Sequence, residues 1–212
     1  MADEHKLALY NRALVFLGQR PLASLTENRK PRRVLDLVWD ANFVREVLSE
    51  GFWNFAARTT SRDASEDVTP PFGFRYAFEK PDDWVRTYSM CTDEFFQCAL
   101  LRFEDEQGYW FADSNKIYVK YVSDDVDYGG NFAIWPPKLF LYAACLLAKG
   151  ACMQITQDQG LEDRVTVQCS DLLAKAKGVD GSADPPRPKQ FGSWVRNRTG
   201  GTRYGYSRND YY

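Results

Sequence analysis

The sequence predicts an α+β protein, with a core of about four helices, an inserted antiparallel β subdomain and an extended C-terminal arm. Apolar residues recur every three or four positions in the flanking segments, short aromatic and β-branched runs fill the middle, and the last residues are basic and aromatic. We expect a helical core over 1–58 and 136–178, a β subdomain over 59–135, a linker over 179–190 and a docking arm over 191–212.

Periodicity predicts four helices in order along the chain. In the first, Leu7, Tyr10 and Leu14 follow one another at helical spacing. The third begins after a Pro-Pro pair, where proline suits the first helical position, and it is apolar on nearly every side, which is typical of a central helix. The expected ranges are 3–17, Pro31 to Glu50, Pro137 through the run KLFLYAACLLAKGACMQITQ, and Leu161 to about Lys177.

Between Phe72 and Trp135 the pattern changes to short runs that predict strands. These runs are FGFRYAF, WVRTYSM, CALLRF, GYWFA and KIYVKYV, divided by turn-forming stretches such as KPDD, EDEQG and DSN. We therefore expect one antiparallel sheet of about five strands. Residues 59–71 are polar and contain two prolines, and we expect them to form a loop.

Aromatic and cysteine side chains in the helical segments fit a packed core. We assign Trp39, Trp53 and Phe55 to stability rather than to binding. The chain has five cysteines with no Cys-x-x-Cys spacing, so we expect all of them to be reduced. Cys145 and Cys152 are seven positions apart in the apolar helical run, which places them on one buried face.

The inventory of catalytic side chains is small, and we expect no enzyme, no cofactor and no metal. The one histidine, His5, falls at the start of the first helix. Asp124, Asp125 and Asp127 are close enough for a hard cation but lack the ligand order of an EF-hand, so a solvated turn is the simpler interpretation. No phosphate-binding glycine loop is present in the sequence.

Charge is distributed unevenly along the chain. Residues 185–212 hold six Lys or Arg and one acid, a net charge of +5, so the remaining 21 basic and 28 acidic residues give −7. The longest apolar stretch, Leu139 to Ala148, is too short for a membrane span, and we expect neither a secreted nor a membrane protein. We expect the arm to bind a partner through Phe191, Trp194, Arg196, Arg198, Arg203, Tyr204, Tyr206, Arg208, Tyr211 and Tyr212.

Several stretches resemble one family in the same order. ALVFLGQRPLASLTENRKPRRVLDLVWDANFVREVLSEGFWNFAARTTS (13–61) is similar to the opening of the head-to-tail adaptor proteins of short-tailed bacteriophages, also named tail tubular protein A or head-completion proteins. YAFEKPDDWVRTYSM (76–90) resembles the segment that follows. GYWFADSNKIYVKYVSDDVDYGGNFAIWPPKLFLYAACLLAKGAC (108–152) resembles the next hairpin and third helix, so the likeness covers about residues 7–178.

The resemblance implies a virion structural protein, assembled in the host cytoplasm, that joins the head to the tail. Members of this family form a dodecameric ring beneath the portal protein, carry the tail nozzle protein, and line a channel through which packaged DNA passes. By this resemblance the arm would contact the portal or a neighbouring subunit. Large aromatic side chains and arginines are the residue types that dominate such contacts.

Two other functions stay open at this point. A nucleic-acid-binding protein would use the basic aromatic arm, with arginines on phosphates and aromatic rings on bases. A carboxylate-based cell-wall hydrolase would need two acids across a cleft, a geometry that sequence alone does not display.

Overall fold

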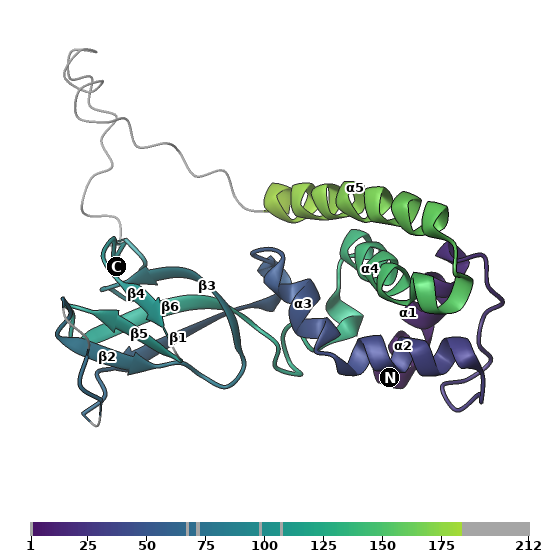
Figure 1. Cartoon of the computed structure of the whole chain (residues 1–212). Coiled ribbons are helices and arrows are strands. Elements are labelled where there is room, and N and C mark those ends of the chain that lie inside the picture. Colours follow the sequence, from purple (N-terminus) through teal and green to yellow (C-terminus); the bar gives the residue numbers. More distant parts are fainter. Residues whose placement is uncertain (1, 67, 71–72, 98, 107, 184–212) are drawn as a thin grey trace, which may run out of the picture.

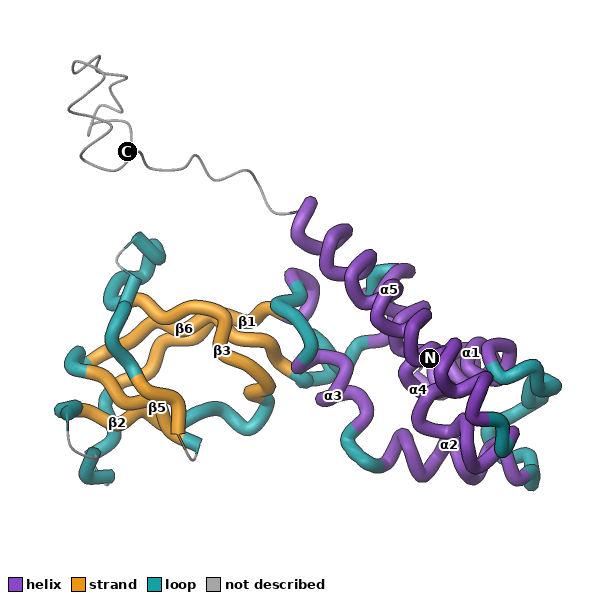
Figure 2. The backbone as a smooth tube through the Cα atoms, turned by 45° about the horizontal axis from the view of Figure 1, so that its top comes forward, coloured by secondary structure: helices purple, strands orange, loops and turns teal. Residues whose placement is uncertain are grey.

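The computed structural model describes residues 2–66, 68–70, 73–97, 99–106 and 108–183. It contains five α-helices and two antiparallel sheets of three strands each, which confirms the predicted α+β class. Helices gather at one end and strands at the other, with α3 (Phe43–Ser49) between them (Figures 1 and 2). The predicted arm, 191–212, lies outside the described residues.

The helical part is built around α4 (Pro137–Thr156). α1 (Ala2–Phe16), α2 (Lys30–Asp40) and α5 (Gln159–Ala183) all pack against it (Figure 1). α4 is also long and apolar enough to cross a membrane, with a mean hydropathy of 1.5, but half of its apolar window is buried inside the protein. Its apolar sides are therefore explained by helices packed on several faces.

The predicted single helix from Pro31 to Glu50 is wrong, because it is two helices. Asn42 adopts a left-handed conformation with φ 63°, between the end of α2 and the start of α3. Asparagine is among the few residues other than glycine that enter this region readily. The break redirects the chain while Phe43, Val47 and Leu48 still reach the core, so the apolar pattern runs through it unchanged.

The β part is two sheets rather than the single sheet that the sequence predicts. β1 (Ala57–Asp63), β6 (Lys116–Ser123) and β3 (Trp84–Cys91) form one sheet in that order. β2 (Tyr76–Glu79), β5 (Tyr109–Ala112) and β4 (Glu104–Glu106) form the other. Side chains of both sheets meet in one small cluster, made of Phe78, Met90, Trp110, Ala112, Ile117, Val119 and Tyr121.

Two strand predictions in this part are also wrong. The predicted loop over 59–71 begins inside a strand, because β1 pairs with β6 along its whole length, from Ala57 with Val122 to Asp63 with Lys116. The expected strand in CALLRF is replaced, in its described part, by one isolated bridge between Cys91 and Ala99. The strand falls instead on 104–106, inside the predicted turn, because β5 supplies the pairing partner.

The linker predicted from residue 179 begins later, because α5 continues to Ala183. A tertiary contact holds its last turns. The Asn54 backbone N–H donates to the Asp180 carboxylate at 3.2 Å, and the Asn54 side chain donates to the Asp180 carbonyl at 3.2 Å. These bonds offset the low helix propensity of Gly178 and Gly181, and they tie α5 to the short 3₁₀ turn Asn54–Ala56 that leads into β1.

The predicted core positions are largely confirmed. Trp53 is 1% exposed, and Cys145 and Cys152 are fully buried on α4. Trp39 and Phe55 are partly buried and pack against this core.

Candidate functional site

The ten residues predicted to bind a partner all lie beyond Ala183 and outside the described residues. The described chain approaches them through the last turns of α5, which the Asn54 contact holds in place.

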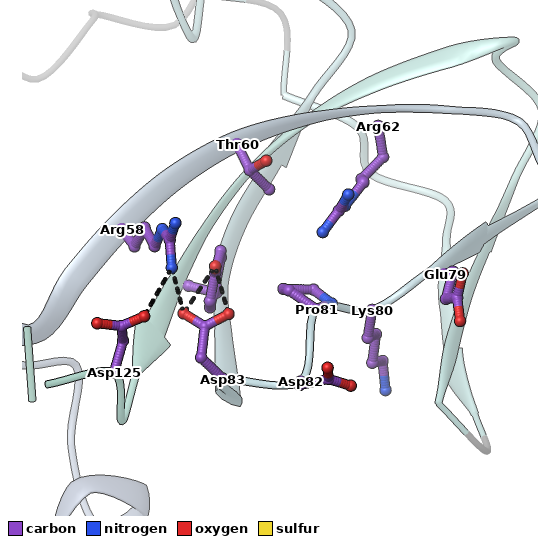
Figure 3. A pocket seen from close by; sticks show the side chains of 10 residues that line it. Arg58, Thr60, Arg62, Glu79, Lys80, Pro81, Asp82, Asp83 and Asp125 are labelled. Atoms are coloured by element: carbon purple, nitrogen blue, oxygen red, sulfur yellow. Dashed lines mark hydrogen bonds and ion pairs between the residues drawn. The ribbon is translucent and has the colours of Figure 1, made fainter. Parts of the chain in front are cut away.

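A polar cavity of about 500 Å³ lies where β1, the turn before β3 and the end of β6 meet (Figure 3). Three of its side chains come from alternate positions of β1, and five others come from the KPDD stretch and the strand before it. Its lining consists of Arg58, Thr60, Arg62, Glu79, Lys80, Pro81, Asp82, Asp83, Tyr121 and Asp125.

Asp83 is the centre of a hydrogen-bond network at the wall of this cavity (Figure 3). Its carboxylate accepts from the Arg58 guanidinium at 2.9 Å and from the Tyr121 hydroxyl at 3.0 Å. The Ser123 hydroxyl donates to it at 2.5 Å. Burial alone would raise the pKa of Asp83, but the three donors outweigh it, so the pKa lies below its ordinary value and the group is ionised.

The pKa of Tyr121 is shifted in the opposite direction, upward. Burial and the neighbouring Asp83 carboxylate raise the pKa of its hydroxyl above the usual range, so it stays a proton donor. Arg58 also lies 3.5 Å from Asp125, and its guanidinium stacks 5.2 Å from the centre of the Tyr128 ring. These contacts hold the acidic stretch 123–130 against β1.

A second set of contacts connects this network to α3. Arg45 of α3 pairs with Asp124 at 2.9 Å and donates to the Trp84 carbonyl, and the Asp124 backbone N–H donates to the Asp83 carbonyl at 3.1 Å. Burial raises the pKa of Asp124 even beside Arg45. Arg86 of β3 donates back to the Ser49 carbonyl at 3.0 Å. We call these contacts of Arg45, Arg58, Asp83, Arg86 and Asp124 the junction brace.

Lys80 and Arg62 differ in how their charges are satisfied. The Lys80 side chain is 6% exposed, pairs with Asp105 and lies 3.9 Å from the centre of the Trp84 ring. The Arg62 Nε is buried and has no hydrogen-bond partner within the described residues. Figure 3 shows the Arg62 side chain extending toward Pro81. Arg62 is thus the cation of this cavity for which no acidic partner is seen in the described chain.

The arrangement suits a structural role better than acid–base chemistry. Glycoside hydrolysis needs one carboxyl with a raised pKa and a second carboxylate free to act. Asp83 is ionised and holds three donors, while Asp124, whose pKa is raised, is paired with Arg45. Of the three acids of the 123–130 turn considered for a cation, Asp124 and Asp125 are engaged in this way, since Asp125 meets Arg58 and accepts from the Asp127 N–H. No group of three metal-binding side chains occurs in the described ranges.

Sequence reasoning missed Arg45, Arg58 and Asp83. They are far apart in the chain, and only the KPDDW stretch carried a local signal, because two acids beside a proline and a tryptophan indicate a turn at a partly buried position.

The chain matches no protein-family model, and no curated protein matches it.

Proposed function

We propose that this protein is a structural adaptor subunit of a bacteriophage head-to-tail junction, which binds other copies of itself and a portal ring. The observation that supports this most is the junction brace. It ties the helical part to the β part through stretches in which the chain resembles the adaptor family, around KPDDWVR and SDDVD.

An adaptor acts by holding two neighbours at a fixed geometry rather than by transforming a substrate. The brace suits that task because it crosses between the two parts at separate points. Arg45 reaches from α3 to the Trp84 carbonyl and Asp124, and Arg86 reaches from β3 to the Ser49 carbonyl. Charge-assisted bonds of this kind are stronger than neutral ones and directional.

The terminal arm supplies the binding side of the proposal. Its composition of tyrosine, tryptophan and arginine matches the residues that contribute most to protein interfaces. Because Asn54 anchors Asp180, the end of α5, which precedes the arm in the sequence, has a defined place on each subunit. In a ring of many copies, modest contacts by each arm add up to a strong attachment.

The test is co-sedimentation of the chain with the portal ring encoded by the same genome. We would compare the full chain with a truncation after Ala183, which keeps Asp180 and every described helix. A second variant, Trp194→Ala with Tyr206→Ala, leaves the chain length unchanged. We expect the full chain to sediment in ring stoichiometry and both variants to stay largely free.

Two outcomes would contradict the proposal. If the full chain does not sediment with assembled, DNA-filled heads, it is not an adaptor for this portal. If the truncation binds as well as the full chain, the arm is not the docking element, and the portal contact must lie on the body.

A further inference from the structure

The outer face of the β1–β6–β3 sheet carries cations beside aromatic rings. Along β6, Ile117, Val119 and Tyr121 point into the core between the two sheets. Successive strand residues point to opposite faces, so Lys116, Tyr118 and Lys120 are on the outer face. Arg86 and Tyr88 of β3 reach the same face beside Phe52, which follows α3. We call Phe52, Arg86, Tyr88, Lys116, Tyr118 and Lys120 the basic face.

Each cation on the basic face lies near one ring. Arg86 is 4.2 Å from the centre of the Phe52 ring, Lys120 is 4.6 Å from that of Tyr88, and Lys116 is 5.8 Å from that of Tyr118. The Phe52 and Tyr88 rings meet edge to face at 4.9 Å, and Phe52 is 42% exposed. Each ring is thus near enough to its cation for a cation–π attraction.

The basic face stands out against an acidic chain. The sequence outside residues 185–212 has a net charge of −7, yet Arg86, Lys116 and Lys120 gather here. A cavity of about 360 Å³ continues the face toward the end of α5 and adds Lys177. The acids alongside are Asp63, 3.5 Å from Lys116, Glu50, 3.9 Å from Lys177, and Asp180, which lines the cavity and accepts from the Asn54 backbone N–H. The two ion pairs with lysine are solvent-exposed, so they hold their lysines weakly.

The charge of this face decides what kind of partner fits it. The last turns of α5 lie beside its edge, because Asp180 and Gly181 line the cavity. The arm that follows in the sequence is itself basic and aromatic, so this face would repel it. A partner must bring negative charge and accommodate planar rings. Phosphodiester backbones meet both conditions, since lysine and arginine neutralise phosphates and aromatic rings stack on bases.

We propose that the basic face binds the backbone of a polynucleotide. This goes beyond the adaptor role and does not depend on it, because the face lies in the described body and needs neither portal nor ring. A single strand would use both the cations and the rings, whereas a duplex would use the cations alone.

The experiment measures binding of the full chain to a labelled oligothymidylate and to a duplex of the same length, by fluorescence anisotropy over a series of salt concentrations. The test variant is Lys116→Glu with Lys120→Glu. The matched control is Arg12→Glu with Arg33→Glu, an equal change of charge at exposed positions on α1 and α2, away from the sheets. The arm is present in every protein, so its contribution to binding is constant.

We expect the test variant to lose about tenfold or more in affinity at low salt. The slope of log affinity against log salt should become shallower by about 1.4 for the single strand, because two phosphate contacts are lost. The control variant should keep the affinity and the salt slope of the parent protein. Unchanged binding by the test variant, or an equal loss by the control, would overturn the proposal.

A third variant distinguishes the two forms of polynucleotide. Tyr88→Leu with Tyr118→Leu removes the rings and keeps the charges. A loss on oligothymidylate alone identifies a single strand as the ligand, whereas unchanged binding to both, together with the loss from the lysine variant, identifies the duplex. Thermal unfolding of each variant, within a few degrees of the parent protein, excludes misfolding as the cause.

Discussion

The helical part and the β part are stabilised in different ways. The helical core joins many aliphatic and alanine side chains of α4 and the other four helices. The β core is much smaller and depends on a few large rings, chiefly Phe78, Trp110 and Tyr121. Around those rings the β part adds polar contacts, such as Thr87, whose hydroxyl accepts from the indole N–H groups of both Trp84 and Trp110.

This difference indicates where the stability of each part comes from. A large aliphatic core is stabilised by burial alone, since each buried side chain contributes about 1.5–3 kcal/mol. A small aromatic core needs hydrogen bonds and ion pairs to fix its geometry, and these connect it to its neighbours. The β part therefore depends on the junction brace for stability more than the helical part does.

The largest expected effect comes from removing one buried tryptophan in each part. Trp53 is 1% exposed in the helical core, and Trp110 is fully buried between the sheets. Each change to alanine should cost about 3–5 kcal/mol of unfolding free energy. We expect Trp53→Ala to lower the whole urea transition. Trp110→Ala should let the β part unfold first, with the helical signal at 222 nm persisting to higher urea concentration.

Circular dichroism and tryptophan fluorescence recorded on the same samples check this. Coincident transitions by both probes in Trp110→Ala would show that the two parts unfold as one unit. The difference in core size would then have no thermodynamic consequence.

The second-largest effect is expected from changing Asp83 of the junction brace, and its size depends on pH. Folding lowers the pKa of Asp83. Its contribution to the free energy of unfolding is therefore present above the unfolded pKa of about 3.9 and is lost as the pH falls through the folded pKa. Asp83→Asn should therefore destabilise the protein by about 1–3 kcal/mol at neutral pH. The difference from the parent protein should vanish in acid, below both pKa values.

Asp124 provides the control, because its shift has the opposite sign. Its pKa is raised by burial, so its contribution is present at low pH and is lost as the pH rises through the folded pKa. The parent protein should gain stability relative to Asp124→Asn as the medium becomes acid. Thermal melts across the acid range measure both differences, and parallel pH profiles for the two variants would refute the assignment of Asp83 to the brace.

The helical part and the β part also differ in how much of their fold the sequence could predict. Tyr10 and Leu14 of the first predicted helix are buried and Leu7 packs against the core, as the helical period requires, because helical periodicity is a local property. β1 was missed because its polar residues become a strand through pairing with β6, far along the chain. The predicted end of α5 is too early because the Asn54–Asp180 contact offsets the low helix propensity of Gly178 and Gly181.

The candidate site was less predictable than the fold. Arg45, Arg58 and Asp83 come from three different segments, and no spacing in the sequence brings them together. The basic face was hidden for a similar reason. Lys116, Tyr118 and Lys120 alternate visibly along one strand, but Arg86 and Phe52 join them only once the sheet pairs and α3 ends beside it.

The smallest expected effect concerns the break between α2 and α3. At φ 63°, Asn42 is in a conformation that disfavours residues with a Cβ by about 1–2 kcal/mol, asparagine less than most, and that glycine adopts freely. Asn42→Ala should therefore destabilise the protein by about 1 kcal/mol. Asn42→Gly should leave it within about 0.5 kcal/mol of the parent, because the relief of strain offsets the added entropy of the unfolded chain. Urea unfolding of both variants measures this. If Asn42→Ala is instead neutral or stabilising, α2 and α3 can join into the continuous helix that the apolar pattern predicts, and the β part would then lose its fixed attachment to α3 through Arg45.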